Sequence, residues 1–284
     1  MLLTSSPHNG ARPGRRPKVL GSSEGRAGPV RARQSMNRVL TIFLLAALGL
    51  PVPAQVFRFS REQMIRHTAG NPFERFPDGR PKVPDSALEA LRMISVDTAV
   101  DLMRERGYPN QFAGDFQILH PGRKLVGRAV TAQYVPWRPD LAETIEADAK
   151  QLGLPSGTNQ RVIDLLGRND VPVVDLMGAA EGRNFGGDNL HAAIYGATGT
   201  GAVVDGTIRD LEGIHELPSQ VYFRAPHPAA VGGVLILGIN IPVKIGPAIV
   251  LPGDVVLGDR TGVAFIPPRL VLEAIERAKA RGGR

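Results

Sequence analysis

Two short segments contain residue types that can bind a small anion and a metal ion: residues 186–190 (Gly-Gly-Asp-Asn-Leu) and the pair Arg209-Asp210. The first is a glycine-rich turn before a predicted helix, Asn189–Tyr195, where free backbone amides and the positive helix end favour a carboxylate or phosphate. An arginine can grip a carboxylate or a carbonyl oxygen, and an aspartate can ligate a divalent cation through oxygen. We therefore interpret these segments as one candidate active site.

Each segment also has an ordinary structural interpretation. The glycine-rich turn is equally typical of a strand-to-helix connection capped by Asp188 or Asn189. The Arg-Asp pair is equally typical of an N-cap aspartate beside a solvated arginine. His191 lies near the loop, and a core or helix-surface role is the simpler interpretation of it. Taken one at a time, these patterns favour structure over function.

The surrounding sequence predicts the elements that position these residues. The apolar strand Val171–Met177 leads into the glycine-rich loop, and a buried strand, Ala202–Val204, ends in a turn at Gly206 that delivers the Arg-Asp pair. Strands and helices alternate through the middle of the chain, while the last third is mostly short strands. This mixture predicts one α/β domain with a layered or barrel-like sheet rather than a doubly wound sheet.

Composition excludes some functions once the charges are located. The net charge is +7, but residues 1–38 hold eight basic side chains against one acidic one, so the remaining residues hold 26 of each. A neutral body offers no overall field for a polyanion, so we expect no nucleic-acid partner. The chain has no cysteine, which excludes disulfide and thiolate chemistry.

The N-terminal region resembles an export signal. Residues 36–38 are Met-Asn-Arg, an apolar run of 12 residues follows from Val39 to Leu50, and small residues precede Gln55. This pattern indicates a signal peptide over residues 36–54, cleaved after Ala54, and the run is too short for a membrane anchor. We expect an exported, periplasmic domain over residues 55–284, with 1–35 as a disordered or misassigned extension; a buried N-terminal helix of a cytoplasmic protein is the alternative.

Taken together, the motifs resemble the 4-hydroxy-4-methyl-2-oxoglutarate aldolase family, which also contains the RraA-like regulators of RNase activity. That family has an aspartate, twenty residues and then Arg-Asp; here 20 residues separate Asp188 from Arg209-Asp210. Its glycine before the aspartate and its leucine after it match Gly187 and Leu190. The family's other motifs match Val203–Gly206, Pro252–Asp254 and Asp259–Val263, and the resemblance covers roughly residues 90–280.

The resemblance implies a compact layered β/β/α, swivelling-domain-like fold that assembles into homotrimers or homohexamers. It implies a lyase that cleaves or decarboxylates a small 2-keto acid through a pyruvate enolate. The amides of Gly187, Asp188, Asn189 and Leu190 would hold the substrate carboxylate. Arg209 would hydrogen-bond the keto oxygen, Asp210 would ligate Mg²⁺ or Mn²⁺, and Asp188 would reach a metal-bound water.

Two positions depart from the family pattern. Active aldolases have an acidic residue three places after the metal-binding aspartate, where this chain has Gly213 preceded by Glu212. The family also uses a glutamate from a neighbouring subunit, for which Glu273 and Glu276 are the candidates. The alternatives are therefore an RraA-like binding or regulatory protein without efficient catalysis, or a lyase for a sugar acid or another hydroxy acid.

Overall fold

The computed structural model describes residues 57–151, 158–178 and 183–282. The chain divides into two units, Met1–Val52 and Pro53–Arg284, and everything below concerns the second. The predicted extension 1–35 and signal peptide 36–54 lie outside the described residues. Within the described ranges, no helix has both the length and the apolar character that crossing a bilayer requires.

A mixed sheet forms the centre of the domain, with the strand order β1-β11-β10-β3-β4-β5-β6-β2 and with β7 paired to β3. Four neighbouring strands run parallel: β3 (Leu125–Pro136), β4 (Asp170–Asp175), β5 (Gly201–Ile208) and β6 (Gln220–Pro226). The strands around them pair antiparallel. The carboxyl ends of β4 and β5 therefore meet at one edge of the sheet, where the candidate residues follow.

Shorter strands complete the sheet and add a separate hairpin. The sheet also contains β1 (Phe112–Ala113), β2 (Gln117–Ile118), β7 (Val234–Ile239), β10 (Val255–Asp259) and β11 (Gly262–Ile266). The hairpin consists of β8 (Val243–Ile245) and β9 (Ala248–Val250). The helices are α2 (Arg61–His67), α3 (Asp85–Leu91), α4 (Val96–Glu105), α5 (Pro139–Gln151), α6 (Thr158–Ile163), α7 (Asp188–Thr198), α8 (Leu211–His215) and α9 (Val271–Gly282), the last preceded by a 3-10 turn, Pro268–Leu270.

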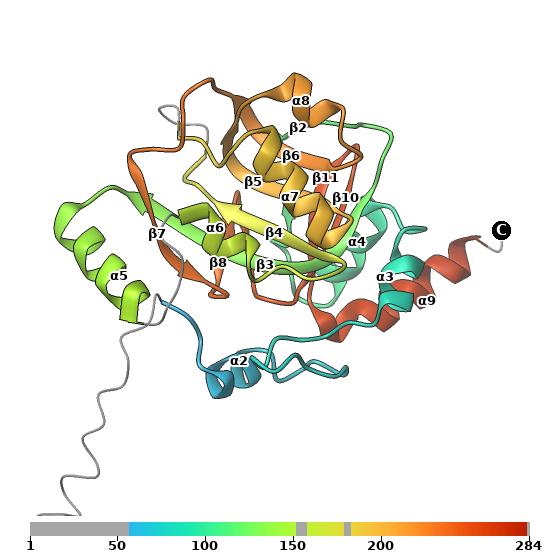
Figure 1. Cartoon of the computed structure of the whole chain (residues 1–284). Helices are drawn as coiled ribbons and strands as arrows, with labels where there is room; N and C mark the ends of the chain where they lie inside the picture. Colours follow the sequence, from blue (N-terminus) through green and yellow to red (C-terminus); the bar gives the residue numbers. More distant parts are fainter. Residues whose placement is uncertain (1–56, 152–157, 179–182, 283–284) are drawn as a thin grey trace, which may run out of the picture. The chain divides into compact units, whose positions relative to one another are not determined.

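Successive residues of a strand point to opposite faces of the sheet. Apolar side chains on both faces therefore pack against a layer on each side. One face of the parallel strands packs against α6, α7 and α8, and the β8–β9 hairpin covers the other. A second helical group, α3, α4 and α9, packs on β10 and β11 and lies together in Figure 1. The predicted mixed α/β fold with β/β/α layering is confirmed.

Several predicted boundaries shift. The strand predicted at Ala202–Val204 extends through residue 208, so Gly206 lies inside β5 and not in a turn after it. A Cβ atom at this glycine would lie 2.6 Å from Leu176 Cβ, so glycine is required there by close packing between β5 and the segment after β4. The helix predicted at Asn189–Tyr195 begins one residue earlier and continues to Thr198. Its N-cap is Gly187, not Asp188 or Asn189.

Candidate functional site

The glycine-rich loop and the end of β5 lie side by side because their backbones are hydrogen-bonded. Phe185 N donates to Thr207 O at 2.9 Å, and Arg209 N donates to Gly186 O at 3.2 Å. An isolated parallel bridge between residues 184 and 207 continues the pairing. The start of α7, at Gly187, is thereby held beside the residues that leave β5.

Asp210 directs its carboxylate at this loop. A Cβ atom on Gly187 would overlap Asp210 Oδ2 and lie 2.9 Å from Asp210 Cγ. Asp210 has φ 55° and ψ 44°, and although it is the N-cap residue of α8, its side chain makes no capping hydrogen bond. A non-glycine residue in this left-handed conformation costs conformational energy, and such costs concentrate at functional sites. Asp210 is therefore the N-cap residue of α8, as the structural interpretation expects, but its carboxylate does not cap the helix.

The side chain of Arg209 is partly exposed beside Asp210. Its Nε lies 3.4 Å from Asp210 Oδ2, and the side chains of the two residues are 39% and 44% exposed. This Nε is buried and has no hydrogen-bond partner within the described ranges, so only the exposed part of the side chain faces solvent. An arginine beside a half-exposed carboxylate keeps donors free for an anionic or carbonyl oxygen.

Asp188 occupies the space that a side chain at position 213 would need. A Cβ atom on Gly213 would lie 2.8 Å from Asp188 Oδ2 and 2.9 Å from Asp188 Cβ. The other oxygen, Oδ1, accepts a hydrogen bond from Asn189 N at 2.7 Å. A carboxylate is thus present next to position 213, although it comes from the first turn of α7 and not from α8.

The remaining loop residues take different roles. Leu190 packs on Gly186, whose missing side chain leaves room for it, and Asn189 is exposed. His191 is fully buried, and neither ring nitrogen has a hydrogen-bond partner among the described residues; burial lowers the pKa of the imidazole to about 4. The core interpretation of His191 is confirmed. The structure brings Gly187, Asp188, Arg209 and Asp210 together; their roles stay predictions.

The carboxylate oxygens at this site suit Mg²⁺ or Mn²⁺ better than a metal ion that takes all of its ligands from protein side chains. Among the described residues, no group of three or more histidine or acidic side chains is placed to hold a metal ion. Mg²⁺ commonly takes one or two carboxylates and completes its shell with water and substrate oxygens, which the half-exposed Asp210 allows. Glu273 and Glu276, the candidates for a neighbouring subunit, lie on α9; they accept hydrogen bonds from Arg106 and Lys279, respectively.

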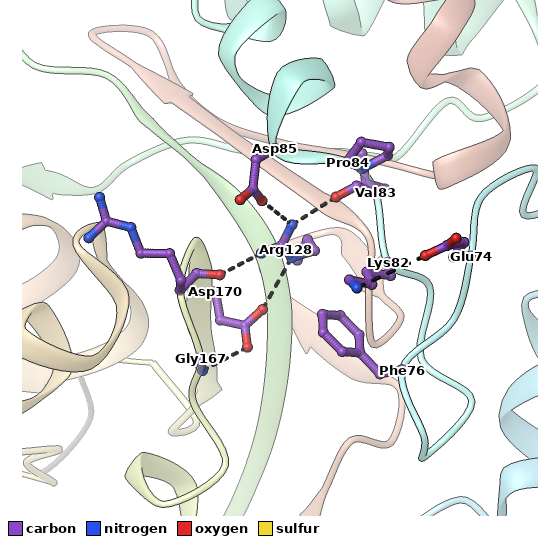
Figure 2. Close-up of a pocket in the computed structure, with 10 residues that line it drawn as sticks. Glu74, Phe76, Lys82, Val83, Pro84, Asp85, Arg128, Gly167 and Asp170 are labelled. Carbon is purple, nitrogen blue, oxygen red and sulfur yellow. Dashed lines mark hydrogen bonds and ion pairs between the residues drawn. The ribbon is translucent and has the colours of Figure 1, made fainter.

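A second charged cluster lies at a cavity of about 510 Å³, and Figure 2 shows residues that line this cavity. Arg80 forms two hydrogen bonds of 2.9 Å to the buried carboxylate of Asp170. Arg128 also contacts Asp170 and donates to Asp85 at 2.7 Å, while the ring of Phe76 lies 4.3 Å from the Arg80 guanidinium. Because these charges satisfy one another, we interpret the cluster as a clamp that joins the segment before α3 to β3 and β4.

Asn184, which is not among the predicted site residues, is fully buried and orders the loop. Its Nδ2 donates to His227 O at 2.8 Å, and His227 N donates to Ile208 O at 2.9 Å. The loop is thereby tied to the chain after β6 as well as to β5. The signal in the sequence was the position of this asparagine directly before the apolar Phe185. An asparagine that is buried with such a neighbour needs hydrogen-bond partners.

The chain is similar to several known proteins. The family described as "RraA-like: Aldolase/RraA" matches residues 96–265. A Halalkalibacterium halodurans protein, provisionally named a 4-hydroxy-4-methyl-2-oxoglutarate aldolase, is 29% identical over 142 residues, or 49% of this chain and 67% of its own. An uncharacterized protein of Methanocaldococcus jannaschii is 38% identical over 205 residues, covering 68% of this chain and 88% of its own. Crystalline RraAS2 of Streptomyces coelicolor, described as an unusual member of the RNase ES inhibitor RraA family, has a TM-score of 0.61 at 26% identity, covering 71% of this chain and 96% of its own.

Proposed function

This chain belongs to the RraA-like family of aldolases and RraA proteins, and we propose that it is a divalent-metal-dependent lyase acting on a 2-keto acid. The proposed reaction is of the 4-hydroxy-4-methyl-2-oxoglutarate aldolase or oxaloacetate decarboxylase type. One observation carries the proposal: an amide loop at a helix start, a partly exposed arginine and an aspartate whose carboxylate points at that loop converge at one place.

The chemistry requires stabilisation of one developing negative charge. In the aldol cleavage, the C4 hydroxyl loses its proton, the C3–C4 bond breaks, and its electron pair forms the enolate of pyruvate while a carbonyl product leaves. In the decarboxylation, the same enolate forms as CO₂ departs. A divalent cation bound at Asp210 would supply Lewis-acid stabilisation of this charge.

The protein groups have distinct parts in this proposal. Backbone amides of the first turn of α7 bind the substrate carboxylate, where the helix end is positive. Arg209 donates to the keto oxygen and stabilises the enolate with a fixed charge. Asp188 Oδ2, beside Gly213, receives the hydroxyl proton directly or through one water.

A regulatory protein without efficient catalysis is the second candidate. Two observations favour it: position 213 lacks the acidic residue of the active aldolases, and RraAS2 is described as a member of an RNase inhibitor family. An RNase target in the cytoplasm conflicts with the export signal predicted from residue 36. We therefore rank the lyase first.

Assembly and location belong to the proposal as well. We expect homotrimers or homohexamers, as the family resemblance implies, and export to the periplasm, as the predicted signal peptide implies. Sedimentation of the purified protein tests the first expectation, with a monomer as the contrary result. Mass spectrometry of the protein recovered from its native host tests the second, and peptides from residues 1–54 on the secreted form would contradict it.

Pyruvate release tests the lyase proposal. Oxaloacetate and 4-hydroxy-4-methyl-2-oxoglutarate are assayed with Mg²⁺ and with EDTA, using wild type, Asp210→Ala and Arg209→Ala. We expect metal-dependent turnover that either substitution nearly abolishes. Asp115→Ala is the matched control, because Asp115 is another exposed aspartate at positive φ, 60°, outside the site. Turnover indifferent to Asp210 and Arg209 contradicts the site, and no turnover on any keto acid favours the regulator.

A further inference from the structure

A cationic pocket lies at the opposite end of β5 from Arg209-Asp210. It has a volume of about 400 Å³, and its charged lining consists of Arg92, Arg123 and Lys124, without a carboxylate. Gly199 also lines it, and the guanidinium carbon of Arg168 lies 3.0 Å from where a Cβ of Gly199 would be. Three cations therefore line one small hollow, and a fourth, Arg168, borders it at Gly199 while it also lines the cavity that contains Asp85 and Asp170.

These cations are only weakly neutralised. Arg92 Nε donates to Glu89 at 2.9 Å, and Lys124 Nζ donates to Ile94 O. Among the described residues, the guanidinium groups of Arg123 and Arg168 form no hydrogen bond or ion pair, although Asp85 lies near Arg168: the pKa of its carboxyl is lowered mainly by Arg128 and also by the charge of Arg168. Outside residues 1–38 the basic and acidic side chains balance. Four cations with only Glu89 at Arg92 and Asp85 near Arg168 are therefore a local positive excess that repels itself unless an anion binds.

The pocket is also held in shape before any ligand arrives. Gln220 lines it, and its amide nitrogen donates at 2.8 Å both to His120 O and to Arg123 O. Its amide oxygen accepts from His120 N at 3.0 Å. The loop that carries Arg123 is thus fixed by three hydrogen bonds. Burial lowers the pKa of the His120 imidazole, and the charge of Arg123 adds to that lowering, as expected beside a positive field.

We propose that this pocket binds the diphosphate group of a small molecule. Arginine guanidinium groups match phosphate oxygens with paired N–H donors, and pyrophosphate at neutral pH carries a charge close to the local excess. The pocket adjoins the start of β5 at Thr200, whereas Arg209 follows the strand's end. The eight residues of β5 separate the two places by roughly 25 Å, so the pocket is distinct from the proposed lyase site.

Calorimetric titration with pyrophosphate tests the proposal. The full chain is titrated in EDTA, both as wild type and as Asp210→Ala, so that a metal at the lyase site cannot hold the ligand. We expect saturable 1:1 binding, equal in the two proteins and weakened by added salt. Arg123→Ala and Arg168→Ala should each weaken binding about tenfold or more. Arg66→Ala, which removes an exposed arginine of α2 outside the pocket, should bind like wild type.

Three results would overturn the pocket assignment. They are absence of binding to wild type, equal weakening by Arg66→Ala, and loss of binding in Asp210→Ala alone. Citrate has a comparable charge but no phosphate. If citrate bound as tightly as pyrophosphate, the choice of a diphosphate ligand would be overturned. These binding results can be interpreted even if the lyase assay fails, because none of them depends on turnover.

Discussion

Two glycine-to-alanine substitutions on the same helix separate site geometry from stability. At Gly187, the N-cap of α7, a methyl group would overlap Asp210 Oδ2 and lie 2.9 Å from Asp210 Cγ, whereas ordinary contact begins at 3.4 Å. At Gly196, inside α7, a methyl group would meet no atom of the described residues within 4 Å. The first substitution changes the position of the proposed metal ligand, and the second changes only helix propensity.

The structure sets the expected sizes. In Gly187→Ala, the carboxylate of Asp210 must retreat by on the order of 1 Å, and a misplacement of this size in a reacting group costs about 10²-fold in rate. The backbone at Gly187, with φ −111° and ψ −158°, is open to alanine, so the loss of stability is limited to about 1 kcal/mol for a poorer cap. Gly196→Ala should instead stabilise the helix by about 1 kcal/mol and raise Tm by roughly 2–4 °C.

Pyruvate release and Mg²⁺ titration measure the first effect, and thermal unfolding measures the second. We expect Gly187→Ala to lose about two orders of magnitude in kcat/KM and to bind Mg²⁺ more weakly, while Gly196→Ala stays as active as wild type. Full activity and unchanged metal affinity in Gly187→Ala would refute the placement of Asp210. Equal activity losses in both variants would show that helix stability, not the carboxylate, controls the rate.

Three further predictions follow from individual contacts. Gly213→Asp should lower pyruvate release at least tenfold and not raise it, because its Cβ would lie 2.8 Å from Asp188 Oδ2 and displace the proposed proton acceptor. Asp170→Asn should lower the free energy of unfolding in urea by about 3–5 kcal/mol, since it leaves buried arginines without their charge partner. Burial raises the pKa of Asp254 to about 7, above its unfolded value of about 3.9; the folded state therefore holds the proton more tightly, and this group's contribution to stability falls as the pH rises from about 4 to 7. Asp254→Asn removes that loss, so its stability relative to wild type should rise by about 4 kcal/mol across this range.

Each of these predictions has a control or a contrary result. Gly213→Ala places a methyl group at the same contact without adding an acid, so higher turnover in the aspartate variant alone would show that the family's acid was missing. Asp140→Asn removes an ion pair whose side chains are 71% and 67% exposed, and it should change stability by less than about 1 kcal/mol. A pH-independent stability difference between Asp254→Asn and wild type would show that this carboxyl does not titrate in the range.

The sequence predicted the elements on either side of the site because their signals are local. The apolar residues before Gly206 identify a buried strand, and the glycine-rich turn at 186–190 precedes the helix that was predicted after it. The prediction of a turn at Gly206 was wrong, because a sequence does not distinguish a glycine required for close packing against Leu176 from a glycine required for a turn. The two-residue strands β1 and β2 were not predicted, because each exists only through pairing with a strand far along the chain.

The site shows the same division between local and non-local information. Residues 186–190 and Arg209-Asp210 each favoured an ordinary structural interpretation, and only their interval joined them through a family resemblance. The physical link is the pairing of residues 184–186 with the end of β5, which depends on the buried amide of Asn184 and on backbone atoms that no side-chain pattern reports. The contact between Asp188 and Gly213 is equally invisible, because it joins the first turns of two helices. In the sequence, the acid missing from α8 therefore indicates a lost function. In the fold, the carboxylate of Asp188 from α7 occupies the neighbouring space. The Gly213 variants decide whether this carboxylate acts as the proton acceptor.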